Sequence, residues 1–277
     1  MSGFQAVLFD FFGTLTTAVE RGEAHTYIAR RLGCSPAAFN TELNRSFPVR
    51  ARGGYGPPIE ALRRVALDAG GSPSEEQLAA CVVARVAAVR ADTRLRPEAV
   101  PVLTDLRQRG LLTGVVSDCC HELPVFLPSL PVAPLLSTCV YSVELAAAKP
   151  DPLMYLAACE RLGVRPRQCL YVGDGGSREL SGAEAVGMTA IRLAAPDLVG
   201  HLRFNTDDDW VGPEITSLSE LPGLIDGAAG AWFRWRNAAL VIPRWTGAGK
   251  QSGRAAAATS HRHRRASQRR LDRRTAR

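Results

Sequence analysis

Short apolar runs alternate with amphipathic segments along most of the chain, and this pattern predicts an α/β fold. The runs are bounded by polar residues or glycine, which is typical of buried parallel strands. We predict strands at residues 5–10, 111–116, 138–141, 168–172 and 189–193. Helices, each followed by a glycine, are predicted at residues 97–109, 152–162 and 177–186. Strands and helices that alternate in this way favour a doubly wound parallel sheet of the Rossmann-like type.

Residues 18–92 interrupt the alternation, because they contain helical patterns and no strand pattern. The pattern predicts four helices, at residues 19–32, 36–46, 58–69 and 75–91; Gly33 ends the first, and prolines or serines mark the starts of the other three. A loop rich in glycine and proline, residues 46–58, separates the second helix from the third. We therefore predict an α/β core made of residues 1–17 and 93–228, with an inserted helical cap at residues 18–92.

The positive charge of the chain is concentrated at its end. Residues 229–277 hold 13 of the 34 Lys and Arg residues but 1 of the 27 Asp and Glu residues, so the rest of the chain is slightly acidic. This tail has no core-forming pattern, and we predict that it is disordered. Its tryptophans among basic residues would suit a nucleic acid or an anionic lipid, and an extension without function is the alternative. For the folded part we expect neither nucleic acid nor membrane as a partner, and the sequence predicts no particular oligomeric state.

The cysteines indicate a reducing compartment. Seven of them are scattered without the paired spacing of zinc sites or disulfide frameworks. The chain starts directly with a strand pattern, and no apolar run reaches the length of a membrane span. We therefore expect a cytoplasmic protein.

Residues that can carry chemistry follow three of the predicted strands. Asp10, Ser117 and Asp174 stand at the carboxyl ends of their strands, and Lys149 precedes a helix. Because the carboxyl ends of parallel strands meet at one edge of a sheet, a single crevice can collect all four. Lys149 is one of only two lysines in the chain, which indicates a site that requires an ammonium group. This set suits attack of a carboxylate on phosphorus beside a Mg²⁺ ion held by oxygen ligands.

Four segments in this order resemble the motifs of the haloacid dehalogenase-like (HAD) hydrolase superfamily. They are the residues 10–15 (DFFGTL), 117–118 (SD), 149–152 (KPDP) and 173–180 (GDGGSREL). The resemblance covers about residues 4–226, and the position of the helical cap is that of the C1-capped subgroup. Four motifs in order are far more specific than any one of them.

The resemblance implies a phosphatase that acts on a small phosphorylated metabolite through an aspartyl-phosphate on Asp10. Ser117 and Lys149 would hold the phosphoryl group. The ligands of Mg²⁺ would be Asp10, Phe12 through its backbone carbonyl, Asp174 and Glu179. For Glu179 the alternative is that an acid at the start of a helix is favoured by the helix dipole alone.

Contacts to the substrate are predicted from loops near these motifs. The turn after Asp10 would offer the backbone amides of Phe11 and Phe12, and Asp118 would offer its backbone N–H. Arg50 and Arg52, in the loop 46–58, would select an anionic substrate from the cap. The alternative for these arginines is a solvated surface position.

Phe12 departs from the pattern that the resemblance implies. In the phosphatases of this superfamily the residue two positions after the nucleophile is an Asp that protonates the leaving oxygen and then activates water. Phenylalanine can do neither, and the loss of a general acid–base residue costs on the order of 10²–10⁴ in rate. His121 follows the Ser117 loop and is a candidate substitute, with a surface histidine as the alternative.

Two other functions stay open at this point. A 2-haloacid dehalogenase-like hydrolase has an aromatic residue at this position and no metal, but Asp174 and Glu179 would then repel Asp10 without a cation. A HAD-fold protein that binds a phosphorylated ligand or a protein partner with little turnover would keep Lys149 and dispense with the acid. The phosphonatase branch is disfavoured because it requires a lysine in the cap, and residues 18–92 contain none.

Overall fold

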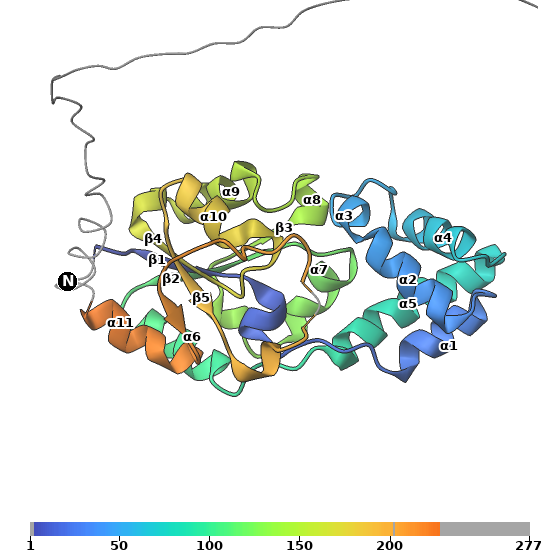
Figure 1. The fold of residues 1–277 in the computed structure, drawn as a ribbon, viewed down its shortest axis with the longest axis horizontal. Helices are drawn as coiled ribbons and strands as arrows, with labels where there is room; N and C mark the ends of the chain where they lie inside the picture. The colour runs from blue at the N-terminus through green and yellow to red at the C-terminus, as the bar shows by residue number, and fades with distance from the viewer. Residues whose placement is uncertain (1–2, 202, 228–277) are drawn as a thin grey trace, which may run out of the picture.

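A parallel sheet of six strands forms the centre of the computed structural model, which describes residues 3–201 and 203–227. The strand order is β3-β2-β1-β4-β5-β6, so β1 lies between β2 and β4 (Figure 1). The strands are β1 (Ala6–Phe9), β2 (Leu112–Ser117), β3 (Thr138–Tyr141), β4 (Cys169–Gly173), β5 (Thr189–Leu193) and β6 (Glu214–Ile215). The predicted parallel α/β fold is confirmed. The two residues of β6 are too few to show a pattern, and this strand was not predicted.

Helices cover both faces of the sheet (Figure 1). Helices α6 (Ala99–Gln108) and α11 (Leu221–Gly227) pack on one face. Helices α9 (Pro152–Leu162) and α10 (Glu179–Ala185) pack on the other. Two short helices, α7 (Glu122–Phe126) and α8 (Ser142–Leu145), follow β2 and β3.

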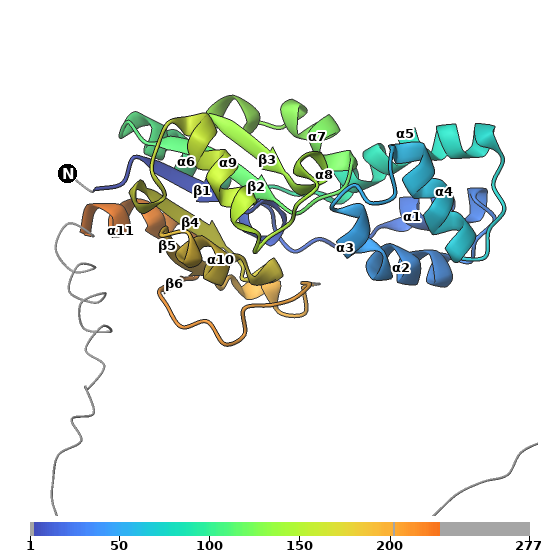
Figure 2. The ribbon, with the colours of Figure 1, turned by 90° about the horizontal axis from the view of Figure 1, so that it is seen from above.

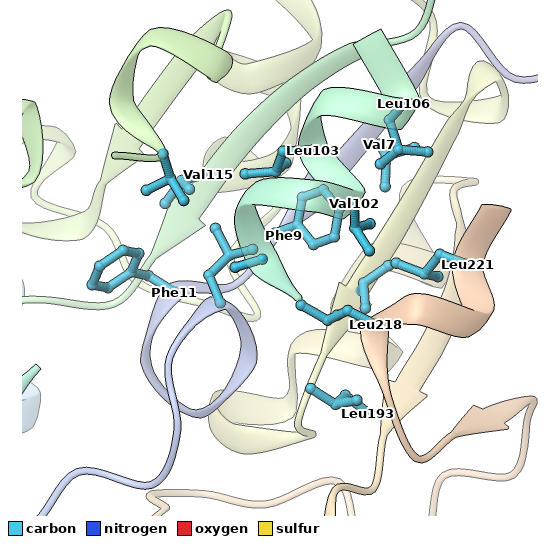
Figure 3. Packing of buried hydrophobic residues seen from close by; sticks show 14 of the residues in the cluster. Val7, Phe9, Phe11, Val102, Leu103, Leu106, Val115, Leu193, Leu218 and Leu221 are labelled. Carbon is cyan, nitrogen blue, oxygen red and sulfur yellow. The ribbon is translucent and has the colours of Figure 1, made fainter. Parts of the chain in front are cut away.

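Strand β1 is apolar throughout because it is buried on both of its faces. Val7 and Phe9 point toward α6 and α11, where they join the larger apolar cluster (Figure 3). Ala6 and Leu8 belong to the cluster under α9 and α10. Side chains of a strand alternate between its faces, so all four apolar residues have a place in one of the two cores.

Five helices form a separate layer beyond one end of the sheet, and we refer to them as the inserted helices (Figures 1 and 2). They are α1 (Glu23–Arg31), α2 (Pro36–Arg45), α3 (Phe47–Arg50), α4 (Pro58–Asp68) and α5 (Glu75–Asp92). They bury an apolar cluster of their own, which includes Ile28, Phe39 and Leu78. The two connections to the sheet lie side by side, because Thr16 and Leu95 form an antiparallel bridge.

The segment 46–58 differs from the expected loop at its start. Residues Phe47–Arg50 form the short helix α3, whose second residue is a proline. Proline is tolerated in the first turn of a helix, where its missing N–H has no partner to lose. As a result Arg50 turns inward and is only 8% exposed.

The basic tail predicted at residues 229–277 lies outside the described residues, and its disorder stays a prediction. Among the helices that the structure describes, none is long and apolar enough to cross a membrane.

Candidate active site

The register of the sheet brings the ends of three strands together. Phe9 pairs with Val115 of β2 on one side and with Val172 of β4 on the other. Asp10, Ser117 and Asp174 therefore emerge at the same edge of the sheet, and all three are buried. The structure thus gathers the residues that the strand pattern places there, at the edge where open α/β sheets bind ligands.

The turn after Asp10 requires glycine at position 13. Gly13 has a φ of 83°, in the left-handed region that side chains rarely adopt. A Cβ atom at this position would lie 2.9 Å from Asp174 Oδ2 and 3.0 Å from His201 Nε2. The glycine therefore lets the turn approach the fourth motif closely.

Lys149 lies at the centre of the site, with its ammonium group between two carboxylates. Its Nζ donates to Asp10 Oδ1 at 2.6 Å and to Glu179 Oε2 at 2.5 Å. Burial alone lowers the pKa of Lys149, but the charges of Asp10 and Glu179 outweigh it and hold that pKa well above its usual value. The backbone N–H of Lys149 donates to Asp118 Oδ1 at 2.9 Å, which fixes the loop.

Three carboxylates converge beside this lysine. One oxygen from each of Asp10, Asp174 and Glu179 lies within 4.8 Å of the others. Burial raises the pKa of Asp174, and the charge of Asp10 raises it further. Burial also raises the pKa of Glu179, partly offset by Lys149. Buried carboxylates at these distances repel one another when they are ionised, and a bound cation would reduce that repulsion.

The carboxylate of Glu179 accepts more hydrogen bonds than that of Asp10 or Asp174. Its Oε2 accepts from Lys149 and from the Tyr171 hydroxyl at 2.9 Å, and its Oε1 accepts from Gly175 N–H at 3.0 Å. This side chain therefore positions the lysine. Its role as a direct metal ligand stays a prediction.

Two buried oxygen atoms at the site have no hydrogen-bond partner among the described residues. They are Ser117 Oγ and Asp174 Oδ2. A buried polar atom without a partner is costly, because it loses its hydration and gains nothing in return. Both atoms lie at the edge where the strands end, and a ligand bound there would supply what they lack.

A pocket of about 440 Å³ opens above this edge, between the sheet and the inserted helices. Most of the predicted site residues line it, namely Asp10, Phe12, Arg50, Asp118, Lys149, Asp174 and Glu179. Ser117 and Phe11 do not line it, because both side chains are fully buried, Phe11 in the apolar core and Ser117 at the end of β2. Arg52 is exposed and donates to Pro48 O.

His121 lies outside this pocket. Its Nε2 contacts Gly56 O at 3.1 Å, on the inserted helices. The structure thus brings neither Arg52 nor His121 to the reacting edge.

A protein-family model for haloacid dehalogenase-like hydrolase matches residues 4–187. The chain belongs to the haloacid dehalogenase-like hydrolases. The matched residues include the four strand-end and loop positions that form the site.

Among curated haloacid dehalogenase-like hydrolases, the chain is similar to both phosphatases and dehalogenases. It is 32% identical to glyceraldehyde 3-phosphate phosphatase of Methanopyrus kandleri over 48% of this chain and 55% of that protein. It is 31% identical to (S)-2-haloacid dehalogenase 1 of Pseudomonas sp. (strain CBS-3) over 47% of this chain and 55% of that protein. The matches thus span about half the length of these relatives.

The solved structures agree on the fold of this haloacid dehalogenase-like hydrolase. A crystal structure of 2-haloacid dehalogenase from Pseudomonas syringae pv. Tomato DC3000 superimposes with a TM-score of 0.58 and 22% identity. It covers 82% of this chain and 100% of its own. At this identity the likeness shows the fold, and the chemistry has to come from the site.

One histidine at the site of this hydrolase was not predicted. His201 lines the pocket, with Nε2 3.9 Å from Asp174 Oδ2. Its Nδ1 accepts from Val19 N–H at 3.3 Å, so Nε2 carries the proton of the neutral ring. His201 lies in an irregular segment without a motif, which gives the sequence no local pattern from which to find it.

Proposed function

We propose that this haloacid dehalogenase-like hydrolase is a Mg²⁺-dependent phosphatase for a small phosphorylated metabolite, with Asp10 as nucleophile and the inserted helices as a C1-type cap. The observation that carries this proposal is the pair of unpartnered oxygens on either side of Asp10. Ser117 Oγ, at the end of β2, suits a phosphoryl oxygen, and Asp174 Oδ2, at the end of β4, suits a cation.

The donor atoms fit magnesium. Asp10 and Asp174 offer carboxylate oxygens, and the backbone carbonyl of Phe12 is the further ligand predicted for this turn. Hard oxygen donors with room for a substrate phosphate are the environment that Mg²⁺ favours. When bound, the ion offsets the negative charges of Asp10 and of the phosphoryl group.

The chemistry then proceeds in two displacements at phosphorus. A carboxylate oxygen of Asp10 attacks the phosphorus atom and the ester P–O bond breaks, which leaves an acyl phosphate on Asp10 and an alkoxide that takes a proton from water. Water next attacks the phosphorus of the acyl phosphate, the bond to Asp10 breaks, and inorganic phosphate is released. Lys149 and Ser117 hold the phosphoryl oxygens through both steps.

The lack of an acid or base at position 12, where Phe12 stands, limits the rate of this reaction. Phenylalanine offers neither a proton for the leaving oxygen nor a base for the attacking water. Substrates whose leaving groups need no proton, such as p-nitrophenyl phosphate and acetyl phosphate, are therefore expected to react much faster than alkyl phosphates.

Removal of the metal is the test of this proposal. We expect the chain to hydrolyse p-nitrophenyl phosphate with Mg²⁺, and treatment with a chelator to lower the rate by on the order of 10²-fold or more. Restoration of the rate by Mg²⁺ shows that the protein was not denatured. Turnover that is indifferent to the chelator would contradict the proposal, and tight binding of phosphate esters without turnover would favour a binding protein.

Carbon–halogen hydrolysis is the second candidate, because Phe12 favours it. A halide leaves without a proton, so an Asp at this position is not needed. The three convergent carboxylates count against this function, since Lys149 offsets only one of their charges and the remaining negative charge favours a bound cation. Release of halide from 2-haloacids in the presence of a chelator would decide for it.

A further inference from the structure

Three arginines from the inserted helices line the pocket opposite the carboxylates. Arg21 precedes α1, Arg50 ends α3, and Arg85 lies in α5. Partial burial lowers the pKa of Arg21, and the charges of Arg85 and Arg50 lower it further. The three guanidinium groups therefore lie near one another. Three carboxylates, Glu20, Asp92 and Glu122, line the same part of the pocket, so what matters is which arginines they leave without a partner.

Arg85 already has a charged partner. Its NH2 donates to Glu122 Oε1 at 2.8 Å, and its NH1 contacts His25 Nδ1 at 3.0 Å. His25 in turn contacts Asp92 at 2.8 Å. The carboxylates Glu122 and Asp92 are therefore both engaged on this wall of the pocket.

Arg50 has no such partner, although it is buried. Its guanidinium donates to Ser46 Oγ at 2.9 Å, to Leu43 O at 2.7 Å and to Cys120 Sγ at 3.0 Å. The sulfur is not a counter-charge, because burial raises the pKa of the Cys120 thiol to about 11. Within the described residues, no carboxylate lies within 4.0 Å of Arg50.

Arg21 is exposed at the rim of the pocket and, like Arg50, has no carboxylate partner in the described part of the chain. It donates to Asn44 Oδ1 at 2.6 Å, and no carboxylate among the described residues lies within 4.0 Å of it. Glu20, its neighbour in the chain, also lines the pocket but is exposed. A buried guanidinium without a counter-charge is costly, and an anion from outside the protein would remove this cost at Arg50. Arg21, which is exposed at the rim, would add a second guanidinium to the same anion.

We propose that the substrate carries a second anionic group, a carboxylate or a second phosphate, which Arg50 and Arg21 bind while the phosphoryl group is held at Asp10. This inference rests on the proposed phosphatase function and narrows its substrate class to phosphorylated acids and bisphosphates. Arginine suits this task, because its planar fork matches both carboxylate and phosphate. A pocket of about 440 Å³ is large enough for a small molecule of this kind.

Matched substrates test the second group. Ethyl phosphate has no second anionic group, phosphoglycolate has a carboxylate as that group, and ethane-1,2-diol bisphosphate has a second phosphate. For each we would measure kcat/KM with Mg²⁺. We expect kcat/KM for one of the two substrates with a second anionic group to exceed that for ethyl phosphate. The substrate with the larger ratio of kcat/KM to that of ethyl phosphate identifies the second group. Equal values for all three would overturn the inference.

The variants Arg50→Gln and Arg21→Gln then test which side chains bind the second anionic group of the substrate. Each is expected to lower the preference ratio by on the order of 10-fold or more, as loss of a charged hydrogen bond does. Arg52→Gln is the matched control, because Arg52 is two residues away and exposed, and it is expected to leave the ratio unchanged. Since Arg50 is buried, thermal melting checks its folding, and the exposed Arg21 gives an independent result. Ratios in both variants that equal the wild-type ratio would overturn the inference.

The proposed function and this inference fail in different ways. If the wild-type chain hydrolyses neither the three esters nor p-nitrophenyl phosphate, the phosphatase proposal fails. Calorimetric titration with phosphoglycolate and ethane-1,2-diol bisphosphate then still tests the anion site. Weaker binding to the Arg50→Gln variant than to the Arg52→Gln variant supports the site, and equal binding overturns it.

Discussion

Replacement of Asp10 by asparagine is expected to abolish turnover, with a loss on the order of 10⁴- to 10⁶-fold in kcat for p-nitrophenyl phosphate. The amide nitrogen and oxygen occupy nearly the same space as the carboxylate, so the change removes the nucleophile and little else. The ion pair of 2.6 Å between Lys149 and Asp10 is also lost. Lys149 keeps its second partner, Glu179, and is therefore expected to stay in place. The rate is measured by release of nitrophenolate at saturating Mg²⁺.

Folding of the Asp10→Asn variant is checked by thermal melting, and its site by titration with inorganic phosphate. A variant that melts as a folded protein, binds phosphate and does not turn over shows that the loss is chemical. Retention of more than about a hundredth of the wild-type rate would rule out Asp10 as the nucleophile, because a lost nucleophile costs far more than this.

Replacement of Phe12 by aspartate is expected to raise kcat for alkyl phosphates by on the order of 10²–10⁴. Phe12 lines the pocket two residues after Asp10, so a carboxyl group there would reach the leaving oxygen. The gain is expected to be smaller for acetyl phosphate, whose leaving group needs no proton, because aspartate then assists only the attack of water on the acyl phosphate. The measurement compares both substrates in the variant and in the wild type.

Phe12→Asn is the matched control for this gain. It removes the same ring, whose centroid lies 5.0 Å from that of Phe11, but adds no acid or base. A similar gain in both variants would show that a more open pocket, and not proton transfer, limits the wild type. No gain in Phe12→Asp, with folding intact, would mean that the site is not built for phosphoryl transfer.

The reacting edge could be predicted from the sequence because each of its residues ends a local pattern. Asp10, Ser117 and Asp174 each follow an apolar run, and parallel strands bring such ends together without any further information. Lys149 could be identified as a site residue because lysine is rare in this chain, which otherwise uses arginine. These inferences needed only short segments and a general rule about sheets.

The opposite wall of the pocket could not be predicted in the same way. Arg50 and Arg52 look alike in the sequence, but one is buried and the other exposed. Positions two apart on a helical turn point in different directions, and α3 itself was expected to be loop. Arg85 is one of two arginines on α5, and its pairing with Glu122 joins residues 37 positions apart.

His201 reaches the site through long-range backbone contacts. The N–H groups of Ser177 and Arg178 donate to the carbonyls of Phe204 and Asn205, at 2.7 Å and 2.8 Å. These bonds fasten the irregular segment that carries His201 to the loop of the fourth motif. No periodicity accompanies such contacts, which is why the sequence does not show them.

Because the chain is similar to both phosphatases and a dehalogenase, the geometry of the site has to distinguish between these two functions. Both chemistries can start from an aspartate at the end of the first strand. What differs is the atom that Asp10 attacks and the need for a cation. The convergent carboxylates and the unpartnered Asp174 Oδ2 support phosphorus and a metal, whereas Phe12 alone is compatible with either.

Trapping of the covalent intermediate tests directly whether Asp10 is the nucleophile in phosphoryl transfer. The wild-type chain is mixed with p-nitrophenyl phosphate and Mg²⁺, quenched with acid within one turnover, digested and analysed by mass spectrometry. Because Phe12 offers no base for the second step, the intermediate is expected to accumulate. We expect a phosphoryl group on the peptide that contains Asp10, together with a burst of nitrophenolate. Turnover that leaves this peptide unmodified, or places the phosphoryl group on another residue, would contradict this expectation.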